Sequence, residues 1–219
     1  MSNIGVLIEM DGQEIKASNY GVLTAACAGG NAVALAFTDN GEEIKSDLMR
    51  FGAGKIVTMS AESPVQKAKL MAAAVKEFNL SALLGLSSAC GRDLLARCAC
   101  ILDAPLALDA MQVNLSEGTV VKSHFSGKTT ATIKLTGGTL LIGLRPNVIE
   151  AVENPVSGEL IPFAAEAGIS DGFKVLEIKK GGAGSIDLTE AEIIITGGRP
   201  MNSAENFNIL HACAEVLPG

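Results

Sequence analysis

The chain has 219 residues, of which 48% are apolar and 4% aromatic, with no tryptophan and a formal net charge of -7. This length allows one large domain, or one domain and part of a second, with a core built from alanine, valine, isoleucine and leucine. The acidic balance argues against nucleic acid and anionic membranes as partners, because no basic stripe is available to neutralise phosphates.

The sequence carries no signal for membrane insertion or secretion. No window reaches the roughly 18 unbroken apolar residues that a membrane span needs, and the first five residues lack the charged start of a signal peptide. We therefore expect a cytoplasmic protein without membrane insertion. The five cysteines form no CxxC pair, so reduced and mostly buried thiols are expected; they are Cys27, Cys90, Cys98, Cys100 and Cys213.

Strand and helix signals alternate through the first hundred residues. Short apolar runs predict buried strands, and the segments between them predict helices. The strands are expected at residues 4–9, 31–38, 55–59 and 81–86, and the helices at 18–28, 44–51, from Ser63-Pro64 onward and at 91–102. This alternation predicts an α/β fold with a mainly parallel, Rossmann-like sheet and helices on both faces.

Two of these helices carry additional signals. Ser18 is the expected N-cap of the first helix, and Ser63 caps the third, with proline in its first turn. The expected inward face of the third helix consists of Val65, Ala68, Met71, Ala72, Val75 and Phe78. That of the helix at 91–102 consists of Leu94, Leu95, Cys98, Ile101 and Leu102.

After Pro105 the pattern changes. Residues 129–136 alternate polar with apolar side chains, as in a strand with one wet face. Strands at 119–125 and 139–144 flank this segment, and glycine-containing turns separate them. We expect a small antiparallel meander that extends the parallel sheet.

The last part of the sequence predicts a second domain. A strand at 173–178 is followed by a glycine-rich linker at 180–185. A strand at 192–196, a glycine turn and the start of a helix then form the opening βα unit of a new α/β domain. We assign residues 1–190 to the first domain and 191–219 to the second. One βα unit cannot bury its own apolar face, so the strand at 192–196 is expected to be loosely held or paired with another chain.

The turn at residues 87–93 (SSACGRD) is one candidate binding site. It follows a strand and opens a helix, where free N–H groups and the helix dipole favour an anion, with Arg92 beside it. The alternative is that Ser87 or Ser88 caps the helix and Gly91 eases the turn. The run matches neither a Walker A loop nor GxGxxG, so the capping interpretation is favoured.

Nothing in the sequence supports nucleophilic or metal catalysis, so we assign no catalytic residue and no metal ligand. Cys90 lies at a helix N-terminus, which can lower a thiol pKa, but no base can be assigned to it. His124 and His211 stand apart from any cluster.

The remaining candidate is Arg199, which follows Gly197 and Gly198. Its planar cation suits a diphosphate or the edge of a flavin, and the glycines let the backbone approach a ligand.

Three stretches resemble the α subunit of the electron transfer flavoproteins: residues 81–111, 124–145 and 193–207. The second of them ends at Arg145, which resembles a later arginine of the family pattern. The third, IIITGGRPMNSAENF, resembles the family signature that enters the flavin domain and is the most specific of the three. Two positions depart from the family pattern, with Lys128 where asparagine is usual and Ala204 where glycine is usual.

The resemblance implies an N-terminal domain similar in fold to adenine-nucleotide-binding α/β proteins, which helps to form the cradle for a flavin domain. It implies a β subunit as partner, and FAD that carries electrons from dehydrogenases, such as acyl-CoA dehydrogenases, to a membrane quinone reductase. In a eukaryote the compartment would be the mitochondrial matrix. Most of the family's flavin motifs have no counterpart here, and only Arg199 matches one. FAD is therefore expected in the complete protein and not in this chain.

Three further hypotheses stay open. The chain could be a stand-alone module that binds an adenine nucleotide at residues 87–93. It could be the scaffolding half of a naturally split flavoprotein, or its end at Gly219 could be an artificial truncation, which is the simplest explanation.

Overall fold

The computed structural model describes residues 2–165, 176–177, 188, 191 and 193–217. The chain divides into two compact units, Met1–Leu176 and Glu177–Gly219, which are described separately. The linker expected at 180–185 lies outside the described residues, as does most of the strand expected at 173–178. The domain boundary at residue 190 stays a prediction.

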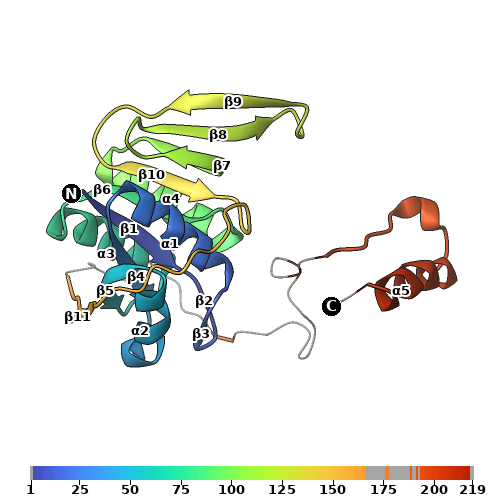
Figure 1. Cartoon of the computed structure of the whole chain (residues 1–219), viewed down its shortest axis with the longest axis horizontal. Helices are drawn as coiled ribbons and strands as arrows, with labels where there is room; N and C mark the ends of the chain where they lie inside the picture. Colours follow the sequence, from blue (N-terminus) through green and yellow to red (C-terminus); the bar gives the residue numbers. More distant parts are fainter. Residues whose placement is uncertain (1, 166–175, 178–187, 189–190, 192, 218–219) are drawn as a thin grey trace. The chain divides into compact units, whose positions relative to one another are not determined.

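The first unit is built on a nine-stranded sheet with the order β11-β5-β4-β1-β6-β10-β7-β8-β9 (Figure 1). Neighbouring strands are parallel from β11 to β7 and antiparallel from β7 to β9. The strands are β1 Asn3–Ile8, β4 Asn31–Phe37, β5 Ala53–Met59, β6 Leu80–Leu86, β7 Leu106–Asn114, β8 Thr119–His124, β9 Thr129–Lys134, β10 Leu140–Leu144 and β11 Glu159–Pro162. A separate two-stranded hairpin joins β2 Met10–Asp11 to β3 Glu14–Ile15.

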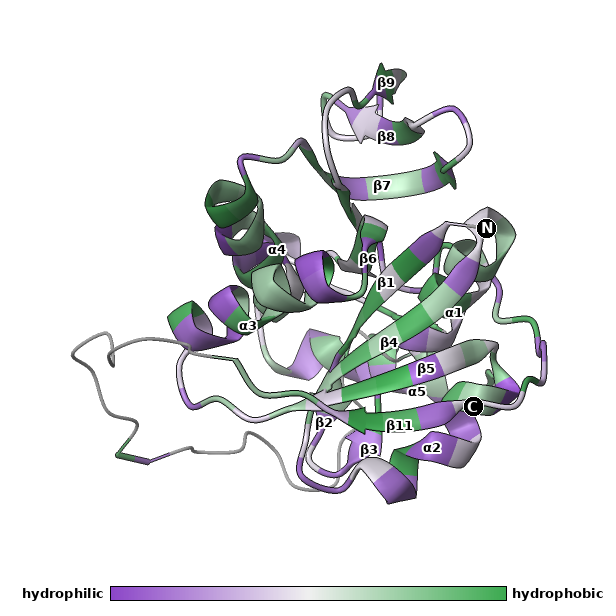
Figure 2. Cartoon of the chain, turned by 90° about the vertical axis from the view of Figure 1, so that its left-hand side faces the viewer, coloured by the Kyte–Doolittle hydropathy of each residue, from purple (hydrophilic) through white to green (hydrophobic). Residues whose placement is uncertain are grey.

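Helices cover both faces of the sheet, which confirms the predicted fold class. The helices are α1 Ser18–Gly29, α2 Gly41–Arg50, α3 Pro64–Glu77 and α4 Ala89–Leu102. One core cluster holds the buried residues of α1 and α2, and the other holds those of α3 and α4. Figure 2 shows α3 and α4 on one side of the central strands and α1 on the other, with apolar residues along β1 and β4. In β6, Leu83 faces the second cluster and Leu84 the first, and both are fully buried.

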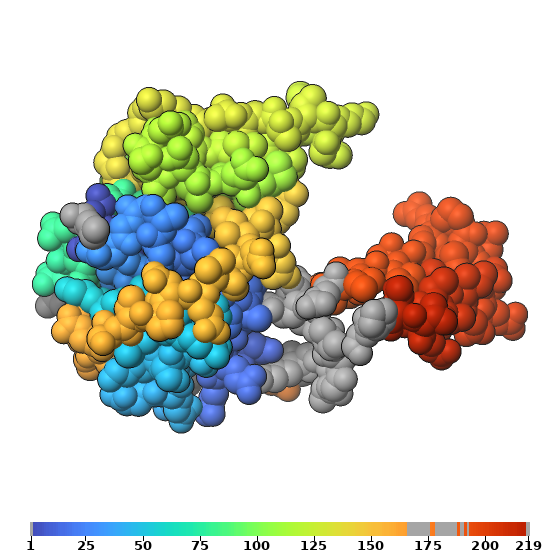
Figure 3. Space-filling view, in the orientation of Figure 1, coloured from blue at the N-terminus to red at the C-terminus, as the bar shows by residue number. Residues whose placement is uncertain are grey.

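The predicted meander is wrong in one strand. Strand β10 runs parallel between β6 and β7, so the antiparallel extension consists of β7, β8 and β9. The reason is burial. Four of the five residues of β10 are buried, as in a strand covered on both faces, whereas in β9 exposed residues alternate with partly buried ones. Figure 3 shows β8 and β9 as yellow-green atoms at the end of this unit.

The helix caps are as predicted in one case and wrong in another. Ser63 forms a full capping box with Gln66. Ser18 is not the N-cap of α1, because Ala17 holds that position and Ser18 lies inside the first turn. The prediction that Ile101 faces inward is wrong: it is 45% exposed, and the buried face of α4 is centred on Leu94, Leu95 and Cys98.

The capping box at Ser63 makes a testable contribution to stability. Its hydroxyl accepts a hydrogen bond from the Gln66 backbone N–H at 3.2 Å, and the Gln66 side chain accepts one from the Ser63 N–H at 3.3 Å. We expect Ser63→Ala to lower the free energy of unfolding by about 1 kcal/mol, measured by urea denaturation. Ser63→Thr, which keeps a capping hydroxyl, should retain most of that stability.

The described part of the second unit contains two 3-10 turns, η1 Arg199–Met201 and η2 Glu205–Phe207, and the helix α5 Asn208–Glu215. The expected helix start is therefore present. The expected strand is not formed between Ile193 and Thr196, and Glu192 lies outside the described residues. A strand needs a neighbour for its N–H and C=O groups, and the described residues supply none here. Ile193 and Ile194 are accordingly half-exposed.

Among the described residues, no helix combines the length and the apolar character required to cross a membrane.

Candidate functional site at the carboxyl ends of the strands

The sheet reverses its strand order between β1 and β6. The chain leaves β1 for β4 and β5 on one side, then crosses to β6 on the other side. In open α/β sheets, ligands bind at such a switch point, in the crevice outside the carboxyl ends of the strands. Here that position is flanked by Glu9, which follows β1, and by Ser87 and Ser88, which follow β6.

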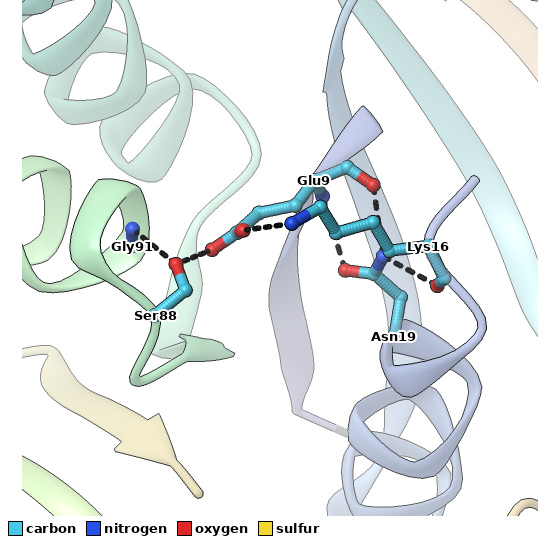
Figure 4. A network of polar contacts seen from close by, with 5 residues as sticks. All are labelled: Glu9, Lys16, Asn19, Ser88 and Gly91. Carbon is cyan, nitrogen blue, oxygen red and sulfur yellow. Dashed lines mark hydrogen bonds and ion pairs between the residues drawn. The ribbon is translucent and has the colours of Figure 1, made fainter. Parts of the chain in front are cut away.

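Glu9 and Ser88 meet at this switch point (Figure 4). The Ser88 hydroxyl donates a hydrogen bond to Oε1 of Glu9 and accepts one from the Gly91 backbone N–H at 2.9 Å. The Glu9 residue is only 6% exposed, and Nζ of Lys16 lies 4.0 Å from its Oε2. A buried carboxylate thus has a hydroxyl on one side and an ammonium on the other.

The backbone of Glu9 is held by Asn19, which is fully buried in the first turn of α1. Oδ1 of Asn19 accepts a hydrogen bond from the Glu9 N–H at 3.0 Å. Nδ2 donates to the carbonyl oxygens of Glu9 and Lys16 at 2.9 and 2.8 Å (Figure 4). Sequence reasoning missed both Glu9 and Asn19. The available signals were an acid directly after a buried strand and an asparagine in the first turn of an apolar helix.

The structure of the turn at 87–93 agrees with the prediction that a serine caps the helix. Ser88 caps α4, while Oγ of Ser87 accepts a hydrogen bond from the Asp109 N–H at 2.7 Å. Arg92 does not join the contacts of Glu9. Its guanidinium lies 3.6 Å from Oδ1 of Asp109.

A second polar cluster surrounds Asp109, which lies in the interior of β7. The Arg145 guanidinium donates to both carboxylate oxygens at 3.1 and 2.8 Å, and also to the Ser123 hydroxyl at 2.8 Å. This fork lowers the pKa of Asp109 and raises that of Arg145. The cluster ties β8 to the parallel part of the sheet.

The lowered pKa of Asp109 makes stability depend on pH. A carboxyl with a lower pKa in the folded state contributes stability above its unfolded pKa, about 3.9, and loses it as the pH falls through the folded value. Between pH 7 and pH 3 we expect wild type to lose more free energy of unfolding than Asp109→Asn, by less than about 1 kcal/mol because the pair is partly exposed. Urea midpoints at both pH values measure this, with the exposed Asp11→Asn as control. Equal pH dependence of stability in wild type and Asp109→Asn would show that the ion pair between Asp109 and Arg145 does not stabilise the fold.

The cysteines differ from expectation in two ways. Cys90, Cys100 and Cys213 are exposed, so the thiols are not mostly buried. The pKa of Cys90 is raised and not lowered, first by desolvation and then by the charge of Glu9. Burial raises the pKa of Cys98 to about 12.

The isolated histidines are both exposed, His124 at the end of β8 and His211 in α5. Within the described ranges, no group of three His, Cys, Asp or Glu side chains is arranged to hold a metal ion.

Arg199 begins the turn η1 and is exposed, as are Gly197 and Gly198. A Cβ on Gly197 would lie 2.8 Å from Cδ1 of Leu210, so the glycine permits close packing of the turn on α5. Gly198 has no such neighbour. Arg199 and these glycines belong to the second unit, whereas Glu9 and Asp109 belong to the first.

Comparison with known proteins identifies the family. The electron transfer flavoprotein domain model matches residues 4–171. Electron transfer flavoprotein subunit alpha of Bacillus subtilis (strain 168) is 30% identical over 198 residues, which is 86% of this chain and 60% of that protein. The same subunit of Thermoanaerobacterium thermosaccharolyticum is 30% identical over 203 residues, 87% of this chain and 62% of that protein. The chain belongs to the electron transfer flavoprotein family.

The similarity is to α subunits and extends across kingdoms. The probable mitochondrial α subunit of Caenorhabditis elegans is 26% identical over 227 residues, 97% of this chain and 66% of that protein. The chain spans about 60% of the length of the first two relatives. The structure accommodates both residues that the sequence analysis singled out as departures from the expected family pattern. Ala204 has ordinary right-handed helical angles, and Lys128 is an exposed residue of the β8–β9 turn.

Proposed function

We propose that this chain is the scaffolding part of an electron transfer flavoprotein α subunit, which works with a β subunit to hold a flavin-bearing domain. It is an electron-carrier subunit and not an enzyme. The observation that carries the proposal is the family match over residues 4–171, which coincides with the α/β unit rather than with the segment containing Arg199.

The described residues favour a supporting role over cofactor binding by this chain alone. Glu9 and Ser88 are hydrogen-bonded to each other at the switch point, where folds of this kind bind a ligand. Arg199 is suited to contact a diphosphate or a flavin edge, but it and both glycines of its turn are exposed, so they cannot enclose a ring system. Arg199 would therefore be one contact of FAD in the complete protein.

In the complete protein, FAD supplies the one- and two-electron chemistry, and the polypeptide supplies position and electrostatics. We propose that electrons pass from dehydrogenases, such as the acyl-CoA dehydrogenases of fatty acid oxidation, to a membrane quinone reductase. A cytosolic location in bacteria, or the mitochondrial matrix in eukaryotes, accords with this role. The split-flavoprotein hypothesis gives this chain the same scaffolding role and differs only in where the flavin-bearing part is encoded.

The partner can be tested by size-exclusion chromatography of the chain mixed with a β subunit of the same family at 0.15 M salt. We expect a 1:1 complex that forms without added FAD. The control mixes the β subunit with an unrelated acidic protein of similar size, to exclude association driven by charge. Separate elution of the two subunits at concentrations of tens of micromolar would contradict the scaffolding role.

A further inference from the structure

The carboxylate of Glu9 lies where folds of this kind receive a ligand's anionic group. The N-terminus of α4 opens directly after β6, next to the switch point of the sheet. Free N–H groups and the helix dipole make such a place favourable for a phosphate. In this chain the negative group there belongs to the protein, since the hydroxyl of Ser88, the N-cap of α4, donates a hydrogen bond to the Glu9 carboxylate (Figure 4).

The space beside the first turn of α4 is already filled. A Cβ on Gly91 would lie 2.7 Å from Oε1 of Glu9 and 2.0 Å from the carbonyl oxygen of Leu86. The carboxylate therefore packs directly on the helix backbone. A phosphate could not approach the Gly91 N–H, because Ser88 already occupies that donor and Glu9 lies behind it.

The carboxylate is also held in place. Asn19 fixes the Glu9 backbone through a donor and an acceptor, so the side chain starts from a defined position. Lys16, with its Nζ 4.0 Å from Oε2, offsets the buried charge. Displacing a buried carboxylate with both kinds of partner is costly, because Lys16 and Ser88 would lose their interactions with it.

We propose that Glu9 is a built-in anion that occupies the switch point beyond the carboxyl ends of β1 and β6 and so excludes the phosphates of a nucleotide from the start of α4. This exclusion separates the chain from nucleotide-binding proteins of similar architecture, and it holds whether or not the chain supports a flavin domain.

The test is isothermal titration of the whole chain with ADP at pH 7.5 and 0.15 M salt. Wild type should show no binding at ADP concentrations up to about 1 mM. A dissociation constant of about 1 mM is the weakest affinity that the method resolves. Glu9→Ala should bind ADP with a dissociation constant at least about tenfold below that limit. Inorganic phosphate should compete with ADP for this site. Glu14→Gln, an exposed glutamate in the same β1–α1 connection, makes a like change in net charge and should bind no ADP.

Glu9→Ser guards against a failure of Glu9→Ala to fold, because it keeps a polar side chain at this position while it removes both the charge and the bulk of the carboxylate. Circular dichroism and thermal unfolding establish which variants are folded. Gained binding in a folded Glu9 variant, with none in wild type, supports the exclusion. Binding of ADP by wild type as tightly as by the variants overturns it, as does the absence of binding in every folded Glu9 variant.

Discussion

Replacing either Leu83 or Leu84 with alanine will lower the free energy of unfolding by about 3 kcal/mol. The two leucines are adjacent in β6, fully buried, and packed into core clusters on opposite faces of the sheet. Each truncation removes apolar contacts and leaves a cavity in a close-packed layer. The loss should therefore be similar for both, and urea denaturation followed by circular dichroism measures it.

Ile101→Ala is the control for this pair, because Ile101 is a large aliphatic residue of α4 that is 45% exposed. Its cost should stay below about 1 kcal/mol. A large loss for only one of the two leucines would mean that one face of the sheet is open, which would contradict the two-sided architecture.

The second large effect is expected from Gly91→Ala. The new Cβ would meet the Leu86 carbonyl oxygen at 2.0 Å and the Glu9 carboxylate at 2.7 Å, so the backbone at the start of α4 must shift away from the end of β6. Overpacking of this kind costs about 1–3 kcal/mol, and the better helix propensity of alanine offsets at most about 1 kcal/mol of it. We expect a net loss near 2 kcal/mol, seen as a fall in Tm of about 4–8 °C for a protein of this size.

Gly54→Ala is the matched control for Gly91→Ala. Gly54 lies in β5, its Cβ would meet nothing within 4 Å, and its φ is not in the left-handed region. Its Tm should remain within about 2 °C of wild type. An unchanged Tm for Gly91→Ala would show that the first turn of α4 does not pack on the end of β6 and on Glu9 as described.

The sequence predicted those parts of the fold that local patterns determine. Apolar runs located β1, β4, β5 and β6, and the Ser63-Pro64 signal located the start of α3. Strand pairing was harder, because β10 was placed correctly along the chain but its neighbours β6 and β7 lie far away in sequence. The segment at 193–196 has the composition of a strand, yet pairing depends on a neighbour that the described residues lack.

The polar site was less accessible to prediction. Ser88 was recognised as a possible cap, since capping is a local property. Its partner Glu9 lies 79 residues away and normally such an acid is exposed, so only the tertiary structure reveals its burial. The same holds for Asp109, whose fork with Arg145 joins positions 36 residues apart.

The most direct test of the scaffolding role is an absorbance spectrum of the purified chain after incubation with FAD and removal of free flavin, repeated with the β subunit present. We predict no bound flavin absorbance near about 450 nm in either sample, since Arg199 and its glycine turn are exposed and cannot enclose the cofactor. Stoichiometric bound flavin would contradict this account, because it would show that Arg199 and its turn suffice for a complete site.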